Sequence, residues 1–294
     1  MSKKISPISL FAIHIEMIRN GHKIGSGTGF IYFHKEMKSH FLITNYHVLT
    51  ARNPKEPERL LKGYPDSPDE LQWKAFKKGT MEVSSGSIDL LVGDNIEWIE
   101  HSMRDHGVDI AAVRINFPDD TSVWSQDMLG LVDDIDLEVG AELFIVGYPY
   151  GIAVRDVLPL WKRGTIASEP LIKPNNLSRF YIDATTMPGM SGSPVFAVET
   201  RKLVDLKGDS ASAFREHEEG DVSALDLFKR LNPQAFAEPY NKKHYRLVGI
   251  YSGRLVDGEK DPSIGIVWNF HLIEELFTNP IIAKHPYPPD RIDA

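Results

Sequence analysis

The 294-residue sequence contains no cysteine. Disulfide bonds and thiolate metal sites are therefore excluded, and packing alone must stabilise the fold. No apolar run reaches the roughly 18 to 20 residues that a membrane-spanning helix needs. The net charge of −8, with no long run of basic residues, argues against binding to nucleic acid or to an anionic membrane. The absence of cysteine fits a reducing compartment, and we expect a cytoplasmic protein.

The N-terminal stretch from Ile5 to Ile13 is apolar and follows two lysines, as in a secretion signal. However, Pro7 interrupts it, the polar residues His14 and Glu16 come directly after it, and no small-residue cleavage site follows. The sequence therefore favours a protein that is not secreted.

Most apolar segments are short, rich in β-branched or aromatic residues, and separated by glycine, proline or charged turns. This pattern is typical of an all-β sandwich or barrel. We predict strands over residues 10–18, 29–33, 41–44, 110–115, 142–146, 179–182, 195–198 and 247–251. Two segments indicate helices instead: 223–231, where Ser223 and Asp226 form a capping box, and a terminal segment around 272–277.

Two polar stretches organise the chain. Residues 117–127, which include Pro118, have the composition of a connector and divide the chain into halves 1–120 and 121–294. Residues 199–245 are charged, poor in strand pattern and longer than an ordinary connection. We therefore predict a functional insertion or mobile loop in the second half.

The segment Met-Pro-Gly-Met-Ser-Gly-Ser-Pro-Val-Phe, residues 187–196, places Ser191 between two glycines and ahead of an apolar strand. Glycine lets the backbone turn sharply enough to aim N–H groups at a developing oxyanion, and here Gly189 and Ser191 would donate. Taken alone, the segment also fits an ordinary turn between strands.

Two further residues change that interpretation. His47 follows the apolar strand 41–44, and Asp109 directly precedes the strand 110–115. Each has an ordinary structural explanation by itself. Together with Ser191 they occur in the order histidine, aspartate, serine, each at the end of a strand, which is the order of chymotrypsin-type enzymes.

Five further segments extend this likeness, at residues 25–32, 146–151, 162–168, 181–186 and 248–253. With the three candidate residues, they make the chain resemble the chymotrypsin-fold (trypsin-like) serine peptidases, closest to the cysteine-poor bacterial HtrA-like and glutamyl-endopeptidase-like branches. The resemblance implies two six-stranded antiparallel Greek-key barrels. The first would carry His47 and Asp109; the second would carry Ser191, the insertion 199–245 and a short C-terminal helix.

The resemblance also implies a serine endopeptidase that cleaves polypeptides through an acyl-enzyme. His47 would act as general base, Asp109 would orient the imidazole, and the N–H groups of Gly189 and Ser191 would form the oxyanion hole. No cofactor is expected. Among the 11 histidines no pair has the spacing of metal ligands, so no metal is expected either.

Four residues are candidates for the substrate pocket. Thr185, six positions before Ser191, matches the residue that floors the primary specificity pocket in the family. Because it is not acidic, we expect a neutral or small side chain before the scissile bond. Tyr251, Ser252 and Gly253 would flank the pocket, and Arg254 could reshape it.

Some positions depart from the family pattern or compete with the chosen residues. Met190 stands where trypsin-like zymogens carry an aspartate, so activation by N-terminal cleavage is not expected. Asp89 lies nearer than Asp109 to the histidine in the sequence, and Ser210 in Gly-Asp-Ser imitates a nucleophile motif. Ser252 is a second candidate partner for the Asp109 carboxylate, although it also fits an ordinary strand serine.

A second class of function remains open at this point. The chain could be a catalytically silent or gated binding module that retains the peptidase fold. In that case the insertion 199–245 would cover the cleft or dock a regulatory protein partner.

Overall fold

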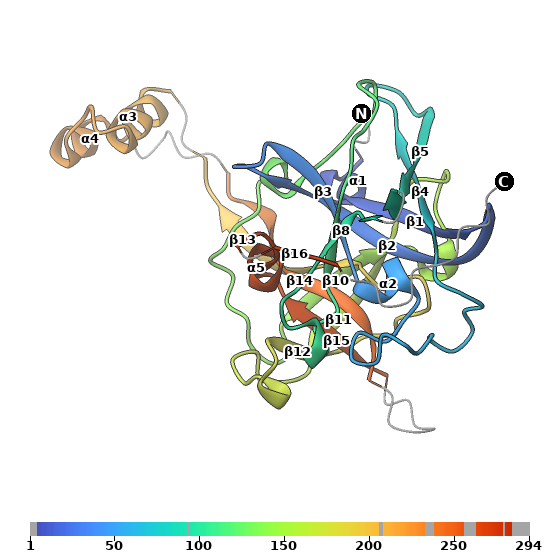
Figure 1. Cartoon of the computed structure of the whole chain (residues 1–294). Helices are drawn as coiled ribbons and strands as arrows, with labels where there is room; N and C mark the ends of the chain where they lie inside the picture. Colours follow the sequence, from blue (N-terminus) through green and yellow to red (C-terminus); the bar gives the residue numbers. More distant parts are fainter. Residues whose placement is uncertain are drawn as a thin grey trace. The chain divides into compact units, whose positions relative to one another are not determined.

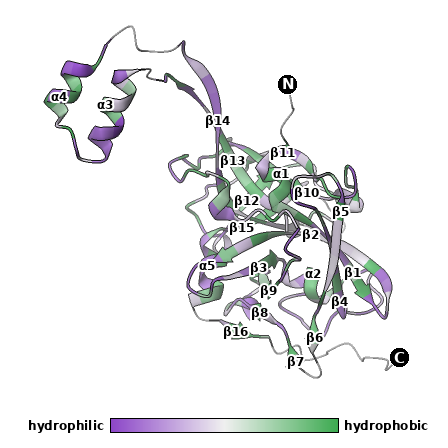
Figure 2. Cartoon of the chain, turned by 90° about the horizontal axis from the view of Figure 1, so that it is seen from above, coloured by the Kyte–Doolittle hydropathy of each residue, from purple (hydrophilic) through white to green (hydrophobic). Residues whose placement is uncertain are grey.

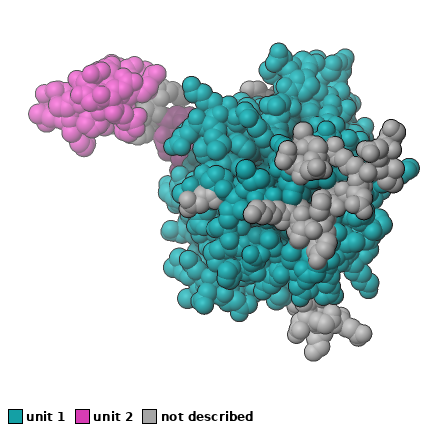
Figure 3. All heavy atoms as spheres, viewed as in Figure 1, with its two compact units in different colours: residues 1–197, 246–294 teal, residues 198–245 magenta. Residues whose placement is uncertain are grey.

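The computed structural model describes residues 5–92, 95–205, 208–232, 238–255, 263–278 and 280–283 (Figure 1). The chain forms two compact units, one of residues 1–197 and 246–294 and the other of residues 198–245 (Figure 3). The larger unit is built from antiparallel strands, which confirms the predicted all-β class. No helix in the described ranges combines the length and apolar character needed to cross a membrane.

The first half of the larger unit contains an eight-stranded sheet in the order β16-β8-β9-β3-β2-β1-β4-β5. Its strands are β1 (Ala12–Arg19), β2 (His22–His34), β3 (Ser39–Thr44), β4 (Glu70–Phe76), β5 (Val83–Asp89), β8 (Trp98–Glu100), β9 (Ala111–Arg114) and β16 (Ile281–Ile282). A separate pair is formed by β6 (Leu91–Val92) and β7 (Asn95–Ile96). This sheet has eight strands where the resemblance implied a six-stranded barrel, and one of the additional strands is β16, which pairs with β8.

The second half forms a closed barrel in the order β10-β11-β12-β15-β14-β13. These strands are β10 (Glu142–Gly147), β11 (Leu160–Ile166), β12 (Arg179–Asp183), β13 (Pro194–Leu203), β14 (Tyr240–Arg254) and β15 (Ile264–Asn269). Six is the number of strands that the resemblance implied for this barrel.

Each half has its own apolar core, because alternate side chains of a strand point to the same face. Ile15, Leu42 and Trp73 are buried in the first half, and Ile145 and Phe180 in the second. Short helical turns precede or connect the strands: α1 (Pro7–Phe11), α2 (Tyr46–Thr50), η1 (Arg104–His106), η2 (Gln126–Met128), η3 (Pro149–Gly151) and η4 (Pro174–Asn176). The predicted strand 10–18 therefore begins later, at β1, because α1 occupies its first residues.

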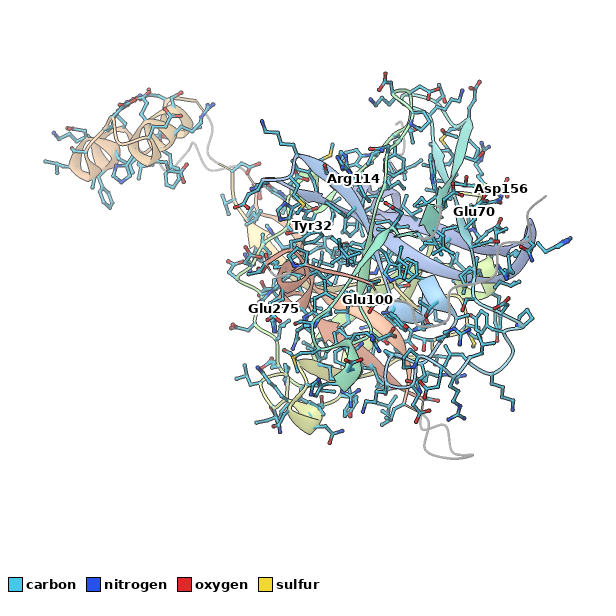
Figure 4. All side chains as sticks on the ribbon, viewed as in Figure 1. Tyr32, Glu70, Glu100, Arg114, Asp156 and Glu275 are labelled. Atoms are coloured by element: carbon cyan, nitrogen blue, oxygen red, sulfur yellow. The ribbon has the colours of Figure 1, made fainter. Side chains whose placement is uncertain are left out.

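The predicted terminal helix is confirmed as α5 (His271–Thr278). It returns to the first sheet, where Phe277 stacks on Tyr32 with ring centroids 5.3 Å apart. On the same side, His101 next to β8 lies 3.2 Å from the carboxylate of Glu275, one of the side chains labelled in Figure 4. This helix therefore fastens the C-terminal part of the chain to the first half.

The smaller unit contains α3 (Asp209–Glu218) and α4 (Ala224–Arg230), between the distal parts of β13 and β14. The Ser223 hydroxyl accepts the Asp226 N–H at 3.2 Å, so the predicted cap of α4 is confirmed. Both helices mix apolar and hydrophilic residues (Figure 2). Residues 199–245 are not a loop throughout, because β13 and β14 extend into this segment and α3 and α4 lie between them. The role of this segment as a functional insertion stays a prediction.

Candidate active site

The pairing of β3 with β9 brings His47 and Asp109 together. Thr44 at the end of β3 lies opposite Ala111 at the start of β9, so the residues just beyond these strand ends are neighbours. His47 Nδ1 lies 2.6 Å from Asp109 Oδ2, and the His47 backbone N–H donates to Asp109 Oδ1 at 3.0 Å. When Nδ1 carries the proton shared with this carboxylate, Nε2 is left as the acceptor.

Asp109 is held from several sides. It is 5% exposed, and its backbone carbonyl accepts the Asn45 side-chain amide at 2.6 Å. The Ser252 hydroxyl donates to Oδ2 at 2.5 Å. With the two contacts to His47, these bonds fix the carboxylate in one orientation, and the imidazole with it.

A β-bulge explains why Ser252 faces Asp109. The register of β14 against β15 shifts between Tyr251 and Gly253, which leaves Ser252 without a partner residue on β15. Gly253 has a φ of +121°, in the region that glycine favours. Bulges commonly redirect a side chain next to a functional site. This bulge turns Ser252 toward the carboxylate of Asp109, which belongs to the first half.

Ser191 lies in a tight turn that requires the glycines on either side. Gly189 and Gly192 have φ values of +90° and +87°. A Cβ on Gly189 would lie 2.5 Å from the Tyr148 carbonyl oxygen, and a Cβ on Gly192 would collide with the Thr28 carbonyl oxygen. The segment therefore excludes side chains at both positions, as the sequence pattern indicated.

Hydrogen bonds to the carbonyl groups of this turn set the direction of its N–H groups. The Pro188 carbonyl accepts the Tyr150 N–H at 2.6 Å, and the Met190 carbonyl accepts the Ser193 N–H at 3.0 Å. In a trans peptide unit the next N–H points the opposite way. The N–H groups of Gly189 and Ser191 therefore point away from these anchors, and neither has an acceptor among the described residues.

Thr28, on β2, joins the serine turn to the first half. Its N–H donates to the Ser191 carbonyl at 2.8 Å and its hydroxyl to the Gly189 carbonyl at 2.9 Å. Its own carbonyl accepts the Thr44 hydroxyl at 2.7 Å, at the strand end that leads to His47. Sequence reasoning noted the glycine-rich segment 25–32 but missed this threonine, whose hydroxyl among glycines was the available signal.

The structure thus brings His47 and Ser252 into direct contact with Asp109 and docks the Ser191 turn on the strand β2 through Thr28. Ser191 is half-buried, and the next residue, Gly192, donates its N–H to the Tyr251 carbonyl at 2.8 Å, beside Ser252. Among the residues that the structure describes, no hydrogen bond joins His47 to Ser191. Such bonds often form only when substrate is bound.

The remaining candidates lie in different surroundings. Thr185 is exposed, whereas Tyr251 is 2% exposed and its hydroxyl shares a hydrogen bond with Thr186. Asp89 is exposed at the end of β5, opposite Glu70, and does not contact His47. Ser210 belongs to the smaller unit, where its hydroxyl donates to the Arg230 carbonyl at 2.9 Å. The composition of the specificity pocket stays a prediction.

No group of three or more histidine, aspartate or glutamate side chains in the described ranges could hold a metal ion. What the arrangement offers instead is an oriented imidazole, a hydroxyl on a fixed turn and two unused N–H donors. These groups are the general base, the nucleophile and the oxyanion donors that acyl transfer requires.

Comparison with solved structures finds proteases with low sequence identity. The HtrA-type protease AlgW with a tripeptide shares 13% identity and a TM-score of 0.45, over 92% of this chain and 60% of that one. A serine endoprotease from Yersinia pestis shares 15% and 0.46, over 92% and 62%. An active-form protease from M. tuberculosis shares 13% and 0.44, over 94% and 83%. The chain spans about three fifths of the length of the first two proteases.

A search among curated proteins gave no significant match. Residues 27–204, more than half of the chain, match the family model of the trypsin-like peptidase domain. The chain therefore belongs to the trypsin-like peptidase domain family, as the resemblance of its sequence indicated.

Proposed function

We propose that this chain is a working endopeptidase in which Ser191, His47 and Asp109 form a catalytic triad. The observation that carries the proposal is the pair of uncommitted N–H groups, Gly189 and Ser191, on a turn docked beside the bonded His47 and Asp109. Such donors stabilise the negative charge of a tetrahedral intermediate.

In the proposed reaction the Ser191 Oγ attacks the scissile carbonyl carbon while His47 Nε2 accepts the hydroxyl proton. The carbonyl π electrons move to oxygen, which the Gly189 and Ser191 N–H groups then bind. As the tetrahedral intermediate collapses, the C–N bond breaks and His47 returns the proton to the leaving amine. Water then attacks the acyl carbon while His47 Nε2 accepts its proton. The ester C–O bond breaks, and His47 returns that proton to Ser191 Oγ, which releases the carboxylic acid.

Casein and a fluorogenic peptide are suitable substrates for the test. The wild type should cleave both, Ser191→Ala should cleave neither, and the rival serine variant Ser210→Ala should cleave both. A fluorophosphonate probe should label the wild type and Ser210→Ala, but not Ser191→Ala. Equal cleavage by the wild type and Ser191→Ala would refute the proposal.

The smaller unit supports a regulatory partner as a second, finer proposal. Three apolar side chains of α3 and α4 are exposed there: Phe214 at 42%, Leu225 at 67% and Phe228 at 74%. A contiguous patch of exposed apolar side chains marks a protein interaction surface, and we propose that these three form such a patch. If the chain is instead a silent binding module, the fluorophosphonate will label no serine while unfolded polypeptide still binds.

We also propose a cytoplasmic location, which the absence of cysteine supports. Fractionation of the source cells, with detection by antibody, would test it. Recovery from the periplasmic or extracellular fraction would contradict this proposal without affecting the catalytic one.

A further inference from the structure

A hollow of about 320 Å³ opens on the outer face of β1, β4 and β5. None of the contacts that assemble the Ser191, His47 and Asp109 site involves its outward-pointing side chains. These six side chains are His14, Glu16, Gln72, Lys74, Ser85 and Ser87. The hollow is therefore a feature that the proposed peptidase chemistry leaves unexplained.

The strand register arranges these side chains in two rows. His14, Lys74 and Ser85 lie opposite one another across the three strands. Glu16, Gln72 and Ser87 form the neighbouring row, two residues along each strand. Cross-strand neighbours on one face are about 5 Å apart, so groups from adjacent strands can contact the same small ligand.

The hydrogen bonds inside the hollow leave donors unused. Glu16 accepts the Lys23 ammonium at 2.6 Å, and the Gln72 amide donates to Glu70 at 2.7 Å. Both of these groups are therefore already engaged. In the described part of the chain, Lys74 and the hydroxyls of Ser85 and Ser87 have no hydrogen-bond or ion-pair partner.

His14 forms a buried wall of the hollow. It is 4% exposed, yet its Nε2 has no hydrogen-bond partner within the described residues. Its ring lies against Tyr148, with centroids 4.9 Å apart. Burial lowers the pKa of His14 to about 4, so the ring is neutral near pH 7. Its Nε2 lies beside Gly151, where an added Cβ would be 3.3 Å away, so the ring shapes the hollow and does not bind the ligand.

We propose that this hollow binds a carboxylate-bearing ligand, with the Lys74 ammonium and the Ser85 and Ser87 hydroxyls donating to its oxygens. A carboxylate can accept from all three donors at once, and a charged partner makes these bonds strong. A single uncommitted ammonium beside the Glu16 carboxylate favours a ligand with one negative charge over a doubly charged phosphate. The carboxylate can come from a free organic acid or from a polypeptide.

Titration of the ¹⁵N-labelled full chain, followed by NMR, tests the proposal at constant ionic strength. N-acetylglycine should shift the amide signals of residues 72–74 and 85–87, and N-acetylglycinamide, which lacks the charge, should not. Lys74→Gln should weaken binding by about tenfold or more, since a hydrogen bond to a charged group is lost. Ser87→Ala should weaken it by about threefold. Lys78→Gln, an exposed lysine outside the hollow, should bind like the wild type.

Two peptide probes identify the source of the carboxylate, in the Ser191→Ala chain so that nothing is cleaved. If acetyl-trialanine acid binds about tenfold more tightly than N-acetylglycine, and its amide does not bind, the ligand is a polypeptide. Equal affinities assign a free acid. The proposal is overturned if the amide shifts the same signals, if phosphate binds more tightly, if the shifts occur only at the Ser191 turn, or if Lys74→Gln and Ser87→Ala both bind normally.

Discussion

Replacing Gly189 with alanine tests the proposed oxyanion hole directly. At a φ of +90° an alanine is strained by about 1 to 2 kcal/mol. Its Cβ would lie 2.5 Å from the Tyr148 oxygen, 3.1 Å from the Tyr150 nitrogen and 3.2 Å from the Gly151 nitrogen. All three are backbone atoms that no side-chain rotation can move. The turn must therefore shift, and the Gly189 N–H loses its direction.

Loss of one oxyanion donor costs about 2.7 to 4 kcal/mol, or about 10² to 10³ in kcat. We expect that fall for Gly189→Ala with a chromogenic peptide ester, while KM changes by less than about threefold because the donor acts mainly in the transition state. Gly140→Ala is the matched control, since Gly140 has a φ of +87° with nothing within 4 Å. A Gly189→Ala enzyme that keeps kcat within about threefold of the wild type would refute the reasoning.

Three further predictions concern the groups around the histidine and the buried His14. Asp109→Asn should lower kcat by about 10⁴-fold in steady-state assays, because an amide favours the wrong imidazole tautomer. Ser252→Ala should lower kcat by about tenfold with normal thermal unfolding, because one bond to the carboxylate is lost; unchanged kcat would contradict this. The lowered pKa of His14 means that the unfolded chain binds more protons between about pH 6.5 and 4. The free energy of unfolding measured with urea should therefore fall by about 1 kcal/mol per pH unit as the pH falls through that window. His14→Gln should make this free energy depend less steeply on pH.

The sequence identified several of the strands whose apolar residues form the two cores, but not β4 or β15. The segments 41–44 and 142–146 coincide with β3 and β10 because alternating or continuous apolar residues bury themselves in a sheet. β5 was missed because Val-Ser-Ser-Gly-Ser-Ile-Asp contains few apolar residues. The pairing with β4, and not the composition of the segment, makes it a strand. α3 was missed for a similar reason, since its serines and charges do not follow a strong helical repeat.

The candidate site could be predicted in chemistry but only partly in geometry. The chain order of His47, Asp109 and Ser191 pointed to residues that the fold places on neighbouring strand ends. The direction of the Ser252 side chain depends on a one-residue bulge, which leaves no signature in local composition. The anchoring of the serine turn by Thr28 depends on a contact 161 positions away along the chain, and a single sequence does not reveal such pairings.

The contact between Ser252 and Asp109 joins groups 143 positions apart in the chain. A ribosome-bound chain that has emerged only as far as Asp109 lacks both Ser191 and the bulge that carries Ser252. Under the proposed function, the nascent chain is therefore unable to cleave polypeptides until these parts have been made and folded. The activity arises only when the strands that follow Ser191 close the second barrel, so folding controls when the chain becomes active.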